Sequence, residues 1–233
     1  MESYAANVGW QLCPCNVIVE GTSDVVLFWF AAALYFERHQ SPILGHQIAI
    51  LPAGKGNEGG VDGVNRRLTA ARQIADVDRD ATGALRHRFI GLFDNDRAGR
   101  RAVDNACNFD RRLLRYGDLF LLHPIMPLSL APDHASLRRR IEIENEPYKG
   151  LDWEIEDLLS DRLLSLFEKH HAQAVERVQE IGGRKHRDFS RDGKQRLHDF
   201  VKINATMDDL SEIVKLLCAL RGYMHVPFDH IKF

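Results

Sequence analysis

The sequence predicts an α/β protein in which a small parallel sheet is flanked by helices. Short apolar runs alternate with helical patterns in its first half, a spacing that favours right-handed βαβ units. Acidic residues directly follow two of these runs, at Glu20 and at Asp94. The runs expected to form the strands are Val17–Val19, Gln47–Leu51, Phe89–Phe93 and Asp118–His123.

A helix is expected after each of the first three strands. Thr22 or Ser23 can cap the first helix, which should end near His39. The glycine-rich stretch Pro52–Gly60 is expected to form a loop that leads into the second helix. The second and third helices are expected over Val61–Ala75 and Arg97–Phe109.

The pattern changes after Pro127. Residues 128–150 contain prolines and a charged run without clean periodicity, so an irregular insertion is expected there. Three helical stretches are expected later in the chain, and the basic segment Gly182–Asp188 separates the first two: Trp153–His171, about Arg191–Val201, and Asp208–Tyr223. The predicted organisation is an α/β core over 1–127, an irregular insertion over 128–152 and a helical part over 153–233 that completes the site.

Composition narrows the class of protein. The 45% share of hydrophobic residues is enough for a core, and the net charge of −2 argues against a chain that is basic overall. The longest apolar run, Val25–Phe36, is too short to cross a bilayer, so it is expected to be a buried helix or a subunit interface. The four cysteines lack the spacing of a disulfide framework or a zinc site, and no secretory signal is recognisable. We therefore expect a cytoplasmic protein with reduced thiols and no membrane partner.

Four carboxylates are expected near one edge of the sheet. Glu20 and Asp94 follow strands, while Asp24 and Asp96 lie close behind them. The carboxyl ends of parallel strands share one edge, which is where open α/β folds place their sites. Carboxylates gathered there repel one another unless a divalent cation holds them, and oxygen ligands suit Mg²⁺ or Mn²⁺. The sequence therefore predicts a metal-dependent site for phosphoryl transfer.

Two motifs resemble a known superfamily. Glu20-Gly-x-x-Asp24 after one apolar run, and Asp94-x-Asp96-x-x-Gly99 after another, resemble the TOPRIM signature. Topoisomerases, bacterial primases and the OLD-family nucleases share that domain. The resemblance covers residues 16–127 directly and the last third of the chain more loosely. It implies a Rossmann-like TOPRIM fold with a C-terminal helical extension.

The details are most similar to the OLD-family nucleases. The segment Trp153–Leu159 resembles the one that supplies a further acidic ligand in that family, here Glu156. The segment Asp192–Arg196 resembles the place of a catalytic lysine, here Lys194. The chain has no Gly-x-x-x-x-Gly-Lys-Ser/Thr phosphate loop of an ATPase domain. The resemblance thus implies a standalone nuclease whose regulator, an ATPase or sensor protein, is a separate chain.

The resemblance gives each residue an expected role. Two cations about 4 Å apart can activate a water and stabilise the leaving oxygen. Asp94 can bridge them through its two carboxylate oxygens, and Lys194 would offset charge that develops in the transition state. The expected catalytic residues are Glu20, Asp94, Asp96 and Lys194. The expected metal ligands are Glu20, Asp24, Asp94, Asp96 and Glu156.

Other interpretations of these residues stay open. Asp24 also suits a helix N-terminus, where the helix dipole stabilises an anion, and the same is true of Glu156. Lys194 can be a surface lysine. Glu20 can act as a metal ligand or as a general base.

Local basic clusters beside an acidic metal site suit a phosphodiester substrate. The leading prediction is a Mg²⁺- or Mn²⁺-dependent endonuclease or nickase acting on DNA, as the toxic effector of a bacterial antiphage defence system. The alternatives are a ribonuclease that cleaves structured RNA or tRNA, and a non-catalytic nucleic-acid-binding or assembly subunit; a homo-oligomer fits each of them.

Three histidines are expected to be exposed and unrelated to metal: His170, His171 and His186. The residues expected to contact nucleic acid are Lys55, Arg97, Arg184, Lys185 and Arg187.

Overall fold

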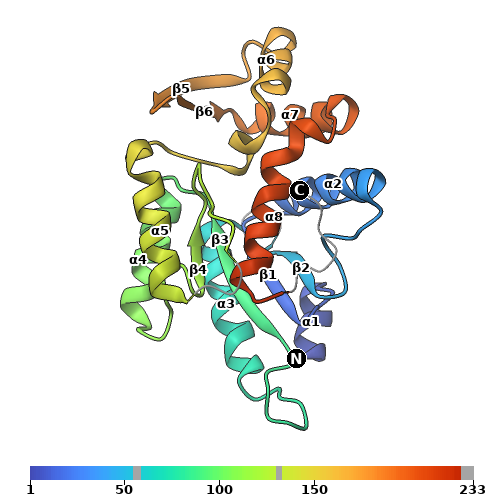
Figure 1. The fold of residues 1–233 in the computed structure, drawn as a ribbon, viewed down its shortest axis with the longest axis vertical. Helices are drawn as coiled ribbons and strands as arrows, with labels where there is room; N and C mark the ends of the chain where they lie inside the picture. Colours follow the sequence, from blue (N-terminus) through green and yellow to red (C-terminus); the bar gives the residue numbers. More distant parts are fainter. Residues whose placement is uncertain (55–58, 130–132, 227–233) are drawn as a thin grey trace.

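A parallel sheet forms the centre of the molecule. The computed structural model describes residues 1–54, 59–129 and 133–226, which form a four-stranded sheet in the order β2-β1-β3-β4 (Figure 1). The strands are almost entirely buried, as expected when helices cover both faces. They span Cys15–Val19 (β1), Ile48–Pro52 (β2), Arg88–Phe93 (β3) and Leu119–Leu121 (β4). The α/β prediction is confirmed.

Three helices connect these strands. After a short first helix α1 (Glu2–Val8), they are α2 (Thr22–His39), α3 (Gly60–Ala75) and α4 (Arg97–Phe109). Helix α2 packs on β2, whereas α3 and α4 pack on each other and on β3 and β4. Because the chain leaves β1 toward β2 and then crosses back to β3, the carboxyl ends of β1 and β3 flank the point where the strand order reverses. Open α/β folds bind ligands at that point.

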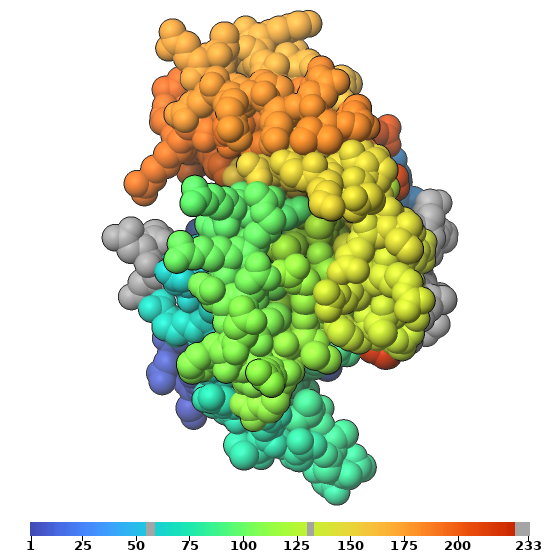
Figure 2. All heavy atoms as spheres, turned by 90° about the vertical axis from the view of Figure 1, so that its left-hand side faces the viewer, coloured from blue at the N-terminus to red at the C-terminus, as the bar shows by residue number. Residues whose placement is uncertain are grey.

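The prediction of an irregular insertion over 128–150 is wrong, because it contains helix α5 (His134–Asn145) and the 3₁₀ turn η2 (Glu146–Tyr148). Asp133 caps α5 by accepting hydrogen bonds from the backbone N–H groups of Ala135 and Ser136. Leu137 and Ile141, one turn apart, bury its inner side. Figure 2 shows α5 beside α4 on one face of the molecule.

The prediction of one helix over Trp153–His171 is also wrong. Trp153 is extended, a 3₁₀ turn η3 (Ile155–Leu158) follows, and helix α6 (Asp161–His170) begins after the cap Ser160. Trp153 and Asn95 exchange two backbone hydrogen bonds, of 2.8 and 3.3 Å. This pairing fastens the segment before η3 to the loop that leaves β3.

The remaining C-terminal elements pack around that segment. A hairpin of β5 (Val175–Ile181) and β6 (Arg184–Phe189) lies where only a basic segment was expected. Helices α7 (Arg191–Asn204) and α8 (Ser211–Tyr223) follow, with a 3₁₀ turn η4 (Asp208–Leu210) between them, and α8 packs against α2. All four cysteines are free thiols. In the described part of the chain no helix is long and apolar enough to cross a membrane.

Candidate metal centre

Glu20 and Asp94 meet at the carboxyl ends of two neighbouring strands. They follow β1 and β3, which pair directly in parallel. Oε1 of Glu20 accepts a hydrogen bond of 3.3 Å from the backbone N–H of Asp94. The structure therefore brings together the first acid of each sequence motif.

Two glycines allow the backbone to turn this tightly around the acids. A Cβ atom at Gly99 would lie 1.9 Å from the backbone oxygen of Asp94, and one at Gly59 would lie 2.7 Å from the backbone oxygen of Glu20. Neither position can hold a larger residue unless the backbone shifts. Gly99 of the Asp94-x-Asp96-x-x-Gly99 motif thus has a steric role, because it lets the first turn of α4 approach Asp94.

Asp24 and Asp96 both serve helix starts. Oδ2 of Asp24 accepts a hydrogen bond of 2.9 Å from the N–H of Gly21 at the start of α2. Oδ1 of Asp96 accepts one of 2.6 Å from the N–H of Gly99 and caps α4. Asp24 also lines the pocket between the acids, and the charge of Asp96 is close enough to raise the pKa of Glu20. For Asp24 the helix-end role and a place in the site coexist.

The C-terminal part adds three side chains from two elements. Glu156 belongs to η3 and is only 3% exposed. From α7, Nε2 of His198 donates a hydrogen bond of 3.3 Å to Oε1 of Glu156, and Nζ of Lys194 lies 3.7 Å from its Oε2. Lys194 also donates a hydrogen bond of 2.7 Å to Glu154. His198 was not expected in this group, although its place one turn after Lys194 on α7 was a usable signal.

These elements enclose a pocket of about 280 Å³. It is lined by carboxylates and one ammonium group, and by residues from the start of α2 and the glycine-rich loop. The chain segments around it are distant in sequence. The charged residues that line it are Glu20, Asp24, Asp94, Glu156 and Lys194.

Burial and mutual repulsion raise the pKa values of three of these acids. Burial raises the pKa of Glu20 to about 7, with a further contribution from the charges of Asp24 and Asp96. Burial and the charge of Glu156 raise the pKa of Asp24 to about 6. The pKa of Asp94 lies well above its ordinary value because it is buried and faces Glu20, Asp24 and other carboxylates. Burial among carboxylates therefore favours the protonated forms of Glu20 and Asp94.

Glu156 and Lys194 behave in the opposite way. Burial alone would raise the pKa of Glu156, but the hydrogen bond from His198 and the charge of Lys194 lower it to about 2. The charges of Glu156 and Glu154 raise the pKa of Lys194 in spite of its burial. The ammonium group and the Glu156 carboxylate thus stay ionised beside the acids that hold protons.

The donor set suits a hard divalent cation. Oε2 of Glu156 is buried and accepts no hydrogen bond from any described residue, so it has a lone pair to offer. Glu20, Asp24 and Asp94 add carboxylate oxygens in the same pocket. Without an ion, no three of these four acids bring ligand atoms within 4.8 Å of one another. A cation there would relieve the repulsion that raises their pKa values. Oxygen ligands of this kind fit Mg²⁺ or Mn²⁺ better than softer metals.

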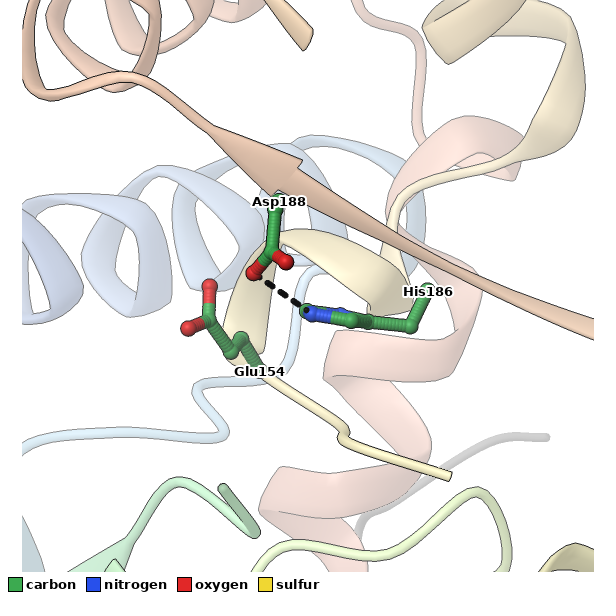
Figure 3. A group of neighbouring side chains, drawn as sticks. All are labelled: Glu154, His186 and Asp188. Atoms are coloured by element: carbon green, nitrogen blue, oxygen red, sulfur yellow. Dashed lines mark hydrogen bonds and ion pairs between the residues drawn. The ribbon is translucent and has the colours of Figure 1, made fainter. Parts of the chain in front are cut away.

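A second acidic group beside this pocket is closed by ion pairs. Glu154, His186 and Asp188 bring potential ligand atoms within 4.8 Å of one another (Figure 3). His186 donates hydrogen bonds to Asp157 and Asp188, at 2.6 and 3.1 Å. Burial opposes its protonation, but these carboxylates raise the pKa of His186 to about 9. A protonated imidazole has no lone pair for a metal, so in this form the group is held together by ion pairs. Its ligand atoms are nevertheless close enough to one another for a metal site, contrary to the expectation that His186 is unrelated to metal.

Two expectations about the hairpin fail. His186 was expected to be exposed and is only 1% exposed, because Asp157 and Asp188 hold it inside. Arg187 was expected to contact nucleic acid, but it is buried and paired with Glu168 and, at 3.3 Å, with Asp161.

The other residues expected to bind nucleic acid are placed differently. Arg97 is exposed on the first turn of α4, near the pocket. Lys185 is exposed on β6 and lies 3.7 Å from Glu180 across the hairpin. Arg184 is half-buried. Lys55 lies outside the described residues.

Comparisons with protein-family models, with curated proteins and with solved structures each gave no match.

Proposed function

We propose that this protein is a metal-dependent nuclease of the TOPRIM type that hydrolyses phosphodiester bonds. The observation that carries the proposal is the pocket in which Glu20, Asp94 and Glu156 converge with Lys194 from three separate parts of the chain. Carboxylates that repel one another are costly to keep together. A bound divalent cation would offset this repulsion and account for the proximity of the carboxylates.

The residues that would hold the cation are Glu20, Asp24, Asp94 and Glu156. When bound, Mg²⁺ or Mn²⁺ would supply positive charge to the scissile phosphate and lower the pKa of an attacking water. Asp96 is engaged with the N–H of Gly99 through one oxygen, and its other oxygen is the one available to a metal.

The protein's own groups would complete the chemistry. Lys194 carries a fixed positive charge at the pocket, where it can stabilise the negative charge that develops on the phosphate oxygens. Glu154 and Glu156 orient that ammonium group. Glu20 would hold the cation or act as the general base that takes a proton from the attacking water.

The surroundings of the pocket support a nucleic-acid substrate. Arg97 is exposed at the start of α4, beside the loop that carries Asp94 and Asp96. We propose DNA as the substrate and structured RNA as the alternative. The resemblance to the OLD-family nucleases also leads us to propose a role in antiphage defence, under the control of a separate ATPase or sensor protein.

The test is cleavage of plasmid DNA and of total RNA in the presence of Mn²⁺, with wild type and Glu20→Gln compared. The substitution keeps the volume of the side chain and removes its charge, so cleavage should fall by at least a hundredfold while the protein stays folded. Glu142→Gln is the matched control, because Glu142 is an exposed acid on α5 that pairs with Arg138. Equal cleavage by wild type and Glu20→Gln would contradict the proposal. Cleavage of RNA alone would assign the alternative substrate.

A further inference from the structure

Helix α2 has apolar residues on two opposite sides. One side faces the sheet and α8 and buries Leu27, Phe28, Ala31 and Tyr35. The other side faces outward, and Figure 1 shows α2 at the edge of the molecule beside α8. Four residues on that outer side form what we call the α2 stripe: Val26, Trp29, Ala33 and Phe36.

The α2 stripe is a continuous row of partly exposed apolar side chains. Trp29 and Phe36 are each 46% exposed and Val26 is 44% exposed. Their spacing of three, four and three residues places them on one line along the helix. Single exposed apolar side chains are ordinary, whereas a continuous row of them indicates an interaction surface. The fully buried core contacts of α2 come from its inner side.

We propose that the α2 stripe is a homodimer interface in which two copies of α2 pack antiparallel. The two-fold axis would cross the outer side of the helix at the height of Ala31, midway along the stripe. Trp29 and Ala33 lie two residues on either side of Ala31, and Val26 and Phe36 lie five residues on either side. Reversing the helix therefore superimposes the stripe on itself. Such self-complementarity is what an interface between identical copies requires.

The side-chain sizes fit this register. Each Trp29 would lie opposite the small Ala33 of the second copy, and each Phe36 opposite the smaller Val26. Large residues facing small ones allow two helices to approach closely and interdigitate. A parallel pairing would instead set Trp29 against Trp29 and Phe36 against Phe36, which would hold the helices apart.

The size of the contact sets its strength. A helix of 18 residues is about 27 Å long, so a contact made by this helix alone is small by the standards of stable dimers. We therefore expect a reversible dimer with a dissociation constant in the micromolar range. The dimer would brace the helix whose first turn carries Asp24, with the two Asp24 residues about 20 Å apart along the helix axes. The proposal does not depend on the nuclease function.

Sedimentation velocity over a range of about 1 to 200 µM tests the interface. The wild type should shift from monomer to dimer across this range, and Trp29→Lys and Phe36→Lys should each weaken dimerisation at least tenfold. The control is Phe109→Lys, because Phe109 is 93% exposed at the end of α4, away from the stripe. Circular dichroism should show all variants folded, since the substituted side chains are already partly in solvent.

Tryptophan fluorescence gives a second readout on the unmodified protein. Trp10 and Trp153 are 6% and 2% exposed, so quenching by iodide reports mainly on Trp29. Quenching should decrease with protein concentration in the same range as the sedimentation shift. A wild type that stays monomeric at 200 µM would overturn the proposal, and so would a dimer that survives Phe36→Lys.

Mixing two variants tests the register. Trp29→Lys and Ala33→Glu should each be monomeric alone, because each places two charges in an apolar contact. In the proposed antiparallel pair, their mixture forms one Lys–Glu contact and one native Trp29–Ala33 contact. A heterodimer in the mixture supports the register, and its absence, when both variants are folded, contradicts it.

Discussion

Nζ of Lys194 lies 3.7 Å from Oε2 of Glu156, the buried carboxylate oxygen that accepts no hydrogen bond from the described residues. One residue comes from α7 and the other from η3, and both line the pocket at the ends of β1 and β3. Lys194 and Glu156 therefore place a charged ammonium group next to a charged carboxylate at neutral pH. The other acids of the pocket gain and lose protons in the presence of these two charges.

Lys194→Ala should therefore separate metal binding from chemistry. Removing a cation does not weaken the attraction of the pocket for Mn²⁺, so Mn²⁺ should still bind. Cleavage should fall by a hundredfold or more, because the charge acts on the transition state. Lys202→Ala is the control, since Lys202 lies on the same helix and is exposed. Cleavage that is unchanged in Lys194→Ala would remove the lysine from the mechanism while leaving the metal site in place.

The pKa of Glu20 predicts how metal-free stability depends on pH. It is raised from 4.5 to about 7 in the folded protein. The folded state therefore holds the proton more tightly than the unfolded chain does, and this contribution is complete below pH 4.5 and lost as the pH rises through 7. Glu20→Gln should melt at a higher temperature than wild type at pH 8, and the difference should disappear near pH 4.5. Thermal melts without divalent ions measure this, and a difference that does not vary with pH would contradict it.

Much of the first half of the fold could be predicted because its signals are local. Each strand there is a short apolar run, and Gly or Asp residues mark its end. Helix α4 begins and ends at the predicted residues Arg97 and Phe109, since Asp96 caps it and its helical pattern is regular. Short buried strands that alternate with capped helices are compatible with few folds other than a parallel α/β sheet.

Two elements of the C-terminal half, α5 and the β5–β6 hairpin, were harder to predict because they carry many charged residues. In α5 only one narrow row, with Leu137 and Ile141, faces the core, and the arginines around it hide the period. Strand β5 is largely exposed, whereas β6 buries charged residues such as His186 and Arg187. The one clear signal of the hairpin was Gly182-Gly183, both with positive φ, which suits a two-residue hairpin turn.

The residues of the candidate site also differ in how far local sequence signals predict their positions. Glu20 and Asp94 could be placed from strand ends alone. Lys194 and Glu156 were placed through resemblance, because nothing local in α7 or η3 reveals that they meet. The internal position of His186 depends on Asp157 and Asp188, and one of those partners is distant in sequence.

His186 should make its own contribution to pH-dependent stability. Its pKa is raised from 6.5 to about 9, so the stabilisation is complete below pH 6.5 and is lost as the pH rises through 9. His186→Gln should cost about 3 kcal/mol at pH 6, because it leaves the buried Asp157 without its ion pair. The cost should shrink toward pH 10. Urea denaturation at a series of pH values measures it, and a cost independent of pH would show that His186 is neutral.

Asp96 can be tested for two roles with two substitutions. Asp96→Ala removes the cap of α4 and should cost about 1 kcal/mol of stability. Asp96→Ser restores a capping oxygen without a carboxylate, so stability should largely return. If Asp96 is also a ligand, Mn²⁺ affinity should fall in both variants. Normal Mn²⁺ affinity in Asp96→Ser would limit Asp96 to the helix cap.

The most direct test of the central claim is Mn²⁺ binding followed by electron paramagnetic resonance, in which bound ions lose the signal of free Mn²⁺. The wild type at pH 8 should bind Mn²⁺, and Asp94→Asn should lose this binding while melting at a higher temperature without metal, because the folded protein no longer buries an acid beside other carboxylates. Asp199→Asn, which changes an exposed acid on α7, should bind as the wild type does. Loss of binding in Asp94→Asn alone supports a metal centre at the ends of β1 and β3. Equal Mn²⁺ binding by wild type and Asp94→Asn, or no binding by either, would contradict it.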